Sequence, residues 1–260
     1  MGIYDSIICS IFFAHYKKEK MSFKFHREEL IKKARELNID IAKNLGDIVY
    51  SYKYRKKLPK EILKTAPHGF YWRIRNIGKS QYEFILENGI EFIEPDRMLP
   101  TIKIPDGTPS IVKKYSVSDE QALLTIVRYN RLIDIFLGII CYSLQNHLRT
   151  TVDGIGQIET DELYVGVDKK GRQFIIPVQA KGGTDKIGIT QIEQDIALCK
   201  QKYPNLICRA IACQFISNDV VAMFEFGIEE ERIVKVNEHH YKIIDADNIS
   251  EDDLSRYSQL

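Results

Sequence analysis

The chain has 260 residues, of which 44% are hydrophobic and 28% charged, so it can form one large or two small globular domains. Its net charge of +1 excludes a polycation, and any nucleic-acid affinity would have to come from a local patch. Residues 22–80 hold 15 Lys and Arg against 6 Asp and Glu, about +9, while residues 217–260 hold 4 against 11, about −7. The basic segment is a candidate polyanion-binding face; a solvated surface with chance asymmetry is the alternative.

The cysteines and the apolar runs indicate the compartment. The five cysteines show no C-x-x-C spacing and are odd in number, which favours buried, reduced thiols in a cytosolic protein. The apolar runs at 7–14 and 132–144 are too short to span a membrane, and the first lacks a basic leader. We therefore expect a cytoplasmic protein with no membrane partner.

The first third of the chain predicts a small basic module. Residues 1–21 fit the later pattern poorly and are interpreted as an N-terminal extension. Residues 22–92 predict helices at 27–37, 43–54 and from about Leu58, then a hairpin formed by 69–75 and 81–87. This order suggests a winged-helix-like, DNA-binding module. Its candidate phosphate contacts are Lys53, Arg55, Lys56, Lys57, Arg73 and Arg75. The interleaved aromatic residues are more simply explained as core.

The remainder predicts a linker and a core. Residues 93–117 contain four prolines and a glycine, which is typical of a linker at a domain boundary. Residues 118–260 predict a long buried helix from about Asp119 to Thr150, strands at 205–216, 220–226 and 233–236, and a short terminal helix. The expected fold class is therefore α/β, with a mixed β-sheet core flanked by helices.

The central stretch from 154 to 202 carries the chemistry. An alternating strand with Glu159, Asp161 and Glu162 is followed by a turn at 168–171 and by a second strand that ends in Gln179-Ala180-Lys181. Because side chains alternate along a strand, we expect Gln179 and Lys181 to share a face. By the same alternation Glu159 and Asp161 share a face, and Glu162 points the opposite way. The hairpin brings Asp161 close to Lys181.

These groups suit phosphodiester hydrolysis, which needs a hard cation held by oxygen ligands and an activated water. Asp161 supplies a carboxylate, and the Gln179 amide and the Ala180 carbonyl supply neutral oxygens. Lys181 can orient the water or neutralise charge. An ordinary surface strand pair with salt bridges is the plain alternative.

Residues 118–216 resemble the PD-(D/E)XK nuclease superfamily, and within it the type II restriction endonucleases. The pattern is carried by Thr160-Asp161 and, after 17 residues, Gln179-Ala180-Lys181. Thr160 replaces the usual Pro. Gln179 replaces an acid, which should weaken Mg²⁺ binding unless Glu159 or Glu162 compensates. Gln191 and Gln194 resemble a helical glutamine that contacts substrate in some members; a solvated helix face is the alternative.

The resemblance implies a restriction endonuclease-like fold and metal-dependent cleavage of double-stranded DNA at a specific sequence. It implies Mg²⁺, or Mn²⁺ in its place, as cofactor, Asp161, Gln179, Lys181 and Glu159 as catalytic residues, and Asp161, Gln179 and Ala180 as metal ligands. A homodimer is expected because both strands must be cut. A cognate DNA methyltransferase is the expected companion. A repair, structure-specific or RNA nuclease of the same fold and a catalytically inactive DNA-binding relative stay open.

Overall fold

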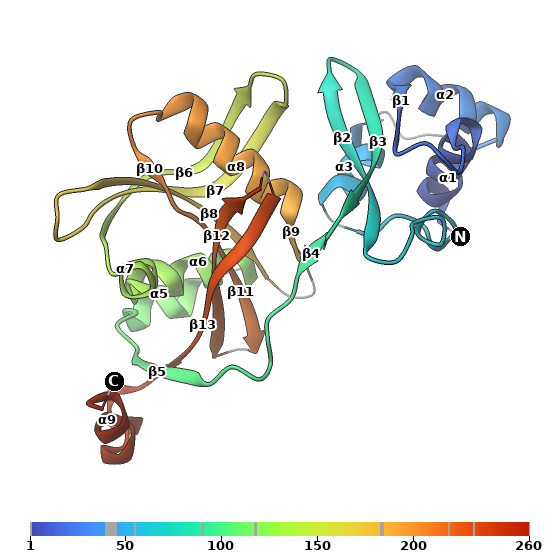
Figure 1. Ribbon diagram of the computed structural model, residues 1–260. Helices are drawn as coiled ribbons and strands as arrows, with labels where there is room; N and C mark the ends of the chain where they lie inside the picture. The colour runs from blue at the N-terminus through green and yellow to red at the C-terminus, as the bar shows by residue number, and fades with distance from the viewer. Residues whose placement is uncertain are drawn as a thin grey trace. The chain divides into compact units, whose positions relative to one another are not determined.

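The chain divides into two compact units in a computed structural model that describes residues 2–39, 46–54, 56–89, 91–116, 119–182, 185–217, 219–230 and 232–259 (Figure 1). The first unit consists of residues 1–93 together with 150–158 and 188–190, and the second consists of 94–149, 159–187 and 191–260. The main division falls at the start of the expected linker. Two short inserts from the expected core group with the first unit.

The first unit combines helices with a three-stranded antiparallel sheet, in the order β1-β3-β2. Its elements are α1 (Ile3–His15), β1 (Ser22–His26), α2 (Arg27–Glu36), α3 (Gly46–Tyr54), α4 (Lys60–Leu63), β2 (Phe70–Gly78), β3 (Gln81–Asn88) and β4 (Phe92–Ile93). The predicted hairpin is confirmed as β2 and β3, which turn at Lys79-Ser80. The helix predicted at 27–37 is confirmed as α2.

The first 21 residues are part of this unit rather than an appendage. In α1, Ile7, Ile8, Ile11 and Phe12 are each 0% exposed. The Phe12 ring packs against Trp72, Phe23 and Phe84 at centroid distances of 5.1–5.2 Å. This apolar run, which did not fit the pattern of the helices after it, therefore forms one wall of the core of the first unit. The other helices are short and the sheet is single, so they could not enclose that core without α1.

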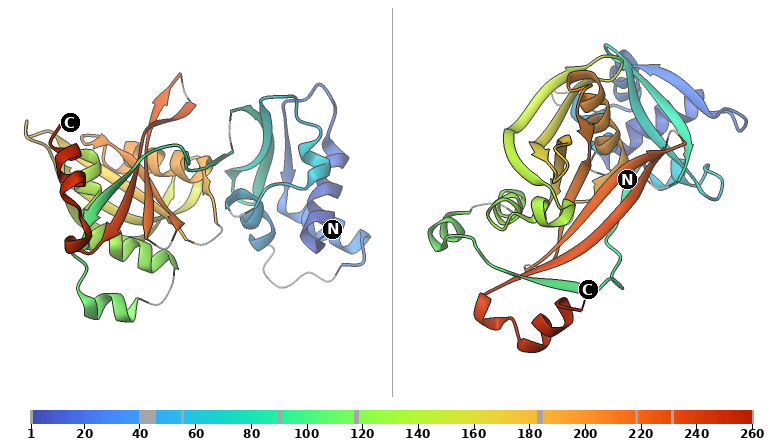
Figure 2. Two further views of the ribbon diagram at one scale, coloured as in Figure 1. Left: turned by 90° about the horizontal axis from the view of Figure 1, so that it is seen from below. Right: turned by 60° about the vertical axis from the view of Figure 1, so that its left-hand side comes forward.

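The second unit is built on a curled, mixed sheet of eight strands in the order β5-β13-β12-β11-β8-β7-β6, with β10 beside β8 (Figures 1 and 2). The eight strands are β5 (Thr101–Pro105), β6 (Ile140–Val152), β7 (Gly156–Val167), β8 (Gln173–Lys181), β10 (Ile207–Cys208), β11 (Ala210–Ser217), β12 (Val220–Glu229) and β13 (Arg232–Ile244), while β9 (Ile187–Gly188) pairs with β4 in a separate two-stranded sheet. Its helices are α5 (Ser110–Tyr115), α6 (Asp119–Tyr129), α7 (Leu132–Leu137), α8 (Ile189–Lys202), the 3₁₀ turn η1 (Ala246–Asn248) and α9 (Glu251–Tyr257). β6, β7, β9 and α8 have residues in both units.

Helices cover both faces of this sheet. α6 and α7 pack on the face that carries Val178 and Ala180 of β8. α8 packs on the other face through Cys199, against Leu163 and Ile175. β8 pairs antiparallel with β7 and parallel with β11, so the sheet is mixed. The expected α/β class with a mixed sheet flanked by helices is confirmed.

The single long helix predicted from Asp119 to Thr150 is wrong. α6 ends at Tyr129, Arg131 and Gly138 adopt left-handed conformations with φ of 52° and 63° on either side of α7, and residues 140–152 form β6. Two left-handed residues cannot be accommodated inside a helix, and Gly138 is a typical helix-ending residue. The apolar residues that seemed to encircle one helix belong to three elements.

The expected linker also contains regular structure. β5 pairs in parallel with β13, with Thr101 opposite His240 and Pro105 opposite Ile244. Two of the four prolines flank this strand or end it, and Pro109 precedes α5. The segment is therefore an edge strand followed by a helix. No helix in the described part of the chain is both long and apolar enough to cross a membrane.

Candidate active site

The β7–β8 hairpin sets the position of the predicted site, all of which lies in the second unit. Regular pairing runs from Glu162 opposite Val178 to Val167 opposite Gln173, and Asp168 closes the turn by accepting hydrogen bonds from the Lys170 and Arg172 amides at 2.9 and 3.0 Å. The predicted turn is confirmed. Asp161 and Lys181 consequently lie at the same end of the hairpin.

Asp161 is fixed by the backbone of β8. Its Oδ2 accepts a hydrogen bond from the Ala180 amide at 2.8 Å. Burial raises the pKa of Asp161, and the positive charge of Lys181 and the Ala180 hydrogen bond oppose this shift. A carboxylate held in this way is short of positive charge, which is the electrostatic condition for binding a cation.

Glu120 enters the site from α6, and the sequence analysis missed it. Its Oε1 lies 3.4 Å from Nζ of Lys181, whose side chain is 12% exposed while that of Glu120 is 48% exposed. The negative charge of Glu120 also contributes to the raised pKa of Asp161. Two carboxylates, Asp161 and Glu120, therefore flank one lysine. No local pattern pointed to Glu120, because this helical residue precedes Asp161 by 41 positions and has no fixed spacing from the strands.

Gln179 is buried, and both polar atoms of its amide are hydrogen bonded. Its Nε2 donates to the Glu159 carbonyl at 3.1 Å and to Asp195 Oδ2 at 2.9 Å, and its Oε1 accepts from Gln191 Nε2 at 3.2 Å. It is 1% exposed. The residue ties β8 to β7 and to α8. A cation at the expected position would have to share the amide oxygen with Gln191, since that oxygen can accept two partners.

Asp195 of α8 is the second group that the sequence analysis missed. It is 1% exposed, and its Oδ1 accepts a hydrogen bond from Thr160 Oγ1 at 2.5 Å. Burial raises its pKa to about 7, although the hydrogen bonds from Thr160 and Gln179 work in the opposite direction. A buried carboxylate beside position 179 explains the amide there, since a second acid would place two negative charges in contact.

The alternation of faces in β7 is broken at Asp161. Thr160 bonds to Asp195 on α8, whereas Glu162, two residues later, forms an ion pair with Arg128 on α6. Residues two apart in a regular strand share a face, and these two contact helices on opposite faces. The regular alternation on which the expectation for Glu159 and Asp161 rests therefore does not hold between Thr160 and Glu162.

Of the two glutamates proposed as the compensating acid, Glu159 lies near enough for its charge to contribute to the raised pKa of Asp161, and Glu162 is bound elsewhere. Glu159 is paired with Arg149, with Nη2 and Oε1 3.1 Å apart. Glu162 is 1% exposed and bound by both Arg128 and the Tyr164 hydroxyl. Its side chain completes a buried network on the α6 face.

The two helical glutamines differ in their surroundings. Gln191 reaches the site through Gln179, and its Oε1 is buried without a hydrogen-bond partner among the described residues. Gln194 is 7% exposed, so its side chain is not presented to solvent. Of the pair, only Gln191 is placed at the candidate site.

The basic residues proposed to bind DNA lie in the first unit and fall into two groups. Arg73 is 8% exposed, forms a two-point ion pair with Glu87 and donates to Thr190 Oγ1 at 3.1 Å. Lys53 is 9% exposed, and burial lowers its pKa to about 8, with the nearby Arg73 charge adding to the shift. These two side chains are therefore buried within the first unit and not exposed for contact with DNA.

The remaining basic residues are closer to solvent. Lys56 and Lys57 are exposed, with Lys56 3.4 Å from Asp5 and Lys57 over the Phe92 ring. Arg75 is paired with Glu83 at 2.8 Å. Arg55 lies outside the described residues.

The donor set suits a hard cation only with help from substrate and water. Within the described part of the chain, no three His, Cys, Asp or Glu side chains gather closely enough to hold a metal ion. Asp161 and Glu120 are two carboxylates at the site, Glu159 acts on Asp161 through its charge, and the Ala180 carbonyl is a further oxygen. Mg²⁺ is commonly held by one or two carboxylates together with waters and substrate phosphates, so these residues fit such a site.

Comparisons with known proteins do not identify a family. Neither the scan against family models nor the searches of curated proteins and of solved structures found a match to this chain.

Proposed function

We propose that the chain is a metal-dependent endonuclease of the restriction type that cleaves double-stranded DNA. The observation that supports this proposal most strongly is the cluster of Asp161, Glu120 and Lys181 at one end of the β7–β8 hairpin. A buried carboxylate with a raised pKa, beside a lysine and a second carboxylate, is the kind of site that phosphodiester hydrolysis requires. The restriction endonuclease-like fold is part of the same proposal.

The chain's own residues have distinct tasks in this scheme. Asp161 and Glu120 would hold the Mg²⁺, which supplies Lewis-acid stabilisation of the phosphate when it is bound. Lys181 places a positive charge where negative charge develops on the phosphate oxygens and orients the attacking water. Gln179, Asp195 and Thr160 keep β8, α8 and β7 in place around these groups.

One observation favours the second candidate, a DNA-binding relative without catalysis. Position 179 carries a neutral amide, so the site has one carboxylate fewer than the pattern it resembles. Glu120 is the group that decides between the two candidates. If it serves the metal, the site keeps two acids despite Gln179.

Cleavage of plasmid and phage DNA with Mg²⁺ or Mn²⁺ tests the proposal. We expect discrete fragments from the wild type and a loss of roughly 10²–10³-fold for Lys181→Ala, as for removal of other charge-stabilising groups. Glu120→Gln should lose activity as well. Lys170→Ala is the matched control, since Lys170 is exposed in the turn at the other end of the same hairpin.

Each other outcome has a defined meaning. Normal cutting by Lys181→Ala would refute the assigned site. Binding of DNA without cleavage at any metal concentration would favour the inactive relative. Cleavage of RNA or of branched DNA alone would change the substrate class while keeping the site.

A further inference from the structure

The two edges of the large sheet are built very differently. The β5 edge has five residues, including Lys103 and Pro105, and α9 covers it. The Lys103 amide donates to the Tyr257 hydroxyl at 3.0 Å, and Lys103 Nζ lies 2.6 Å from Asp253. A short edge with a lysine, a proline and a covering helix resists pairing with another chain.

The β6 edge contains no lysine and no proline. It is 13 residues long, and in the described part of the chain no strand lies on its outer side. Its first seven residues, 140–146, contain no charge and no proline. Ile140, Tyr142 and Leu144 are 54%, 59% and 48% exposed. An exposed, uncharged and apolar stretch at the edge of a sheet usually has a partner.

The outward-pointing backbone groups of β6 can be assigned. The Cys141 amide donates to Asp134 Oδ1 on α7 at 3.0 Å instead of to β7, so it points away from the ladder. Amides alternate in direction along an antiparallel strand, and those of Ser143 and Gln145 therefore point outward as well. They offer hydrogen bonds to a further strand.

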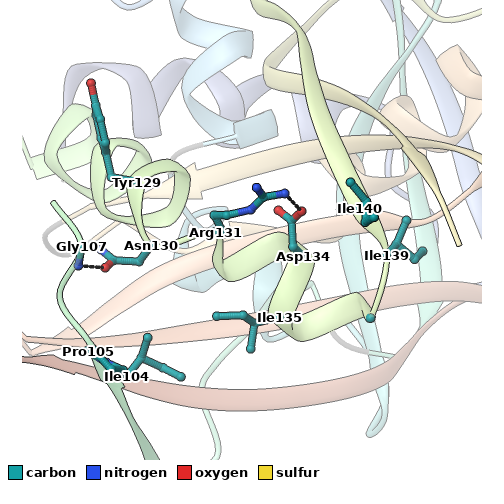
Figure 3. A pocket seen from close by; sticks show the side chains of 11 residues that line it. Ile104, Pro105, Gly107, Tyr129, Asn130, Arg131, Asp134, Ile135, Ile139 and Ile140 are labelled. Atoms are coloured by element: carbon teal, nitrogen blue, oxygen red, sulfur yellow. Dashed lines mark hydrogen bonds and ion pairs between the residues drawn. The ribbon is translucent and has the colours of Figure 1, made fainter. Parts of the chain in front are cut away.

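The apolar surface extends from the start of β6 onto the neighbouring helices. An open groove of about 590 Å³ lies there, and Tyr129, Ile135, Ile139 and Ile140 are among its lining residues (Figure 3). Tyr129 and Ile135 are 44% and 47% exposed. With the three side chains of β6, five large side chains are about half exposed, roughly 500 Å² of surface. Doubled across a symmetric pair this reaches about 1,000 Å², the lower limit for a specific interface.

We propose that β6 pairs antiparallel with β6 of a second copy across a two-fold axis near Leu144. The axis places Ser143 of one copy opposite Gln145 of the other, so the outward groups pair reciprocally. A second copy fits this edge because the stretch carries no charge that would select a differently charged partner. Leu144 of one copy then meets Leu144 of the other on the axis, and Tyr142 lies opposite Asn146.

Sedimentation of the full chain, without DNA or metal, tests this interface independently of nuclease activity. At about 1–100 µM, the range suited to a small interface, we expect a concentration-dependent dimer. Leu144→Lys should abolish the dimer by placing two lysines at the axis. Val236→Lys is the matched control, since Val236 is 58% exposed on β13 of the same sheet. A monomeric wild type, or a Leu144→Lys variant that still dimerises, would overturn the proposal.

Disulfide crosslinking gives a second test, in which the expected result is a new bond and not a loss that misfolding could also cause. Directly opposed residues have Cβ atoms about 4.5–5.5 Å apart, so Leu144→Cys should form a disulfide between copies. Diamide accepts the two hydrogens that the thiols lose. We expect covalent dimer for Leu144→Cys and none for Val236→Cys or the wild type. Equal crosslinking of the two variants would contradict a two-fold axis at Leu144.

Discussion

Position 179 shows how one side chain depends on another. Asp195 accepts a hydrogen bond from Gln179, and both residues are 1% exposed. An amide can donate to this carboxylate, whereas a second carboxylate cannot unless one of the two is protonated.

Gln179→Glu should therefore destabilise the protein despite restoring the acid of the resembled pattern. We expect a cost of about 1–3 kcal/mol at neutral pH, because two buried carboxylates would meet. The cost should shrink at about pH 5, where the pair can share a proton. Urea unfolding at both pH values measures this loss of stability. Gln173→Glu, at the exposed start of β8, is the control. A gain of cleavage in Gln179→Glu would instead show that this side chain acts on the substrate.

Because the pKa of Asp195 is raised, we expect the stability of the protein to depend on pH. Its pKa is raised to about 7 by burial, so the folded chain keeps a proton that the unfolded chain loses from about pH 4 upward. The free energy of unfolding therefore falls as pH rises from about 4 to 7, and the contribution of the protonated form is absent above that window.

Asp195→Asn should remove this slope, since its amide can donate to Thr160 while its oxygen accepts from Gln179. The gain relative to wild type at about pH 8 is at most about 4 kcal/mol, and it should vanish near pH 4. Denaturant titrations across the window compare it with Asp185→Asn, an exposed control. A variant that keeps the wild-type slope would show that Asp195 is not the titrating group.

At the scale of secondary-structure elements, the sequence correctly predicted helices and hairpins that depend on residues close together in the chain. α2 and the β2–β3 and β7–β8 hairpins follow from apolar spacing and turn residues. Residues 140–152 were mistaken for helix because their strand state depends on pairing with β7, which the sequence of β6 does not display. Gly138 was the available signal for the break.

The candidate site likewise combines residues that the local sequence predicted with residues that it did not. Asp161, Gln179 and Lys181 were predicted because they lie on two strands joined by one turn. Glu120 and Asp195 come from α6 and α8, and only tertiary packing brings them to the strands. The irregularity at Asp161 could not be predicted either, because it reflects contacts on both faces of the sheet.

We expect a large loss of stability when a buried side chain of α1 is truncated. Phe12→Ala should cost about 3–5 kcal/mol of the stability of the first unit, because its ring is fully buried. Phe13→Ala is the matched control, since the neighbouring ring is 48% exposed. Trp72 is the one tryptophan of the chain and lies 5.1 Å from the Phe12 ring, so its fluorescence during unfolding reports this unit. Equal losses in the two variants would contradict a buried role for α1.

At the scale of the whole molecule, the charge is concentrated at the two ends of the chain, but not all of the positive charge is available. Arg73 and Lys53 are buried, whereas Lys57 is exposed. Under the proposed function, counterion release from DNA should therefore depend on the exposed lysines.

Lys57→Ala should weaken DNA binding across sequences and reduce the slope of log affinity against log salt by about 1. Arg73→Ala should instead lower stability, by about 1–3 kcal/mol, because it removes a buried side chain that pairs with the half-buried Glu87. Salt titrations of DNA binding, with Lys170→Ala as control, separate the two. An unchanged slope for Lys57→Ala would place the DNA contacts elsewhere.

The parallel pairing of β5 with β13 has a consequence for synthesis of the chain. Residues 101–105 leave the ribosome well before residues 232–244, with which they pair. At about 5–20 residues per second, β5 waits on the order of 10 s for its neighbour. During that interval Lys103 and Pro105 protect an incomplete sheet from joining other nascent chains. The second unit is therefore completed only once β13 has left the ribosome.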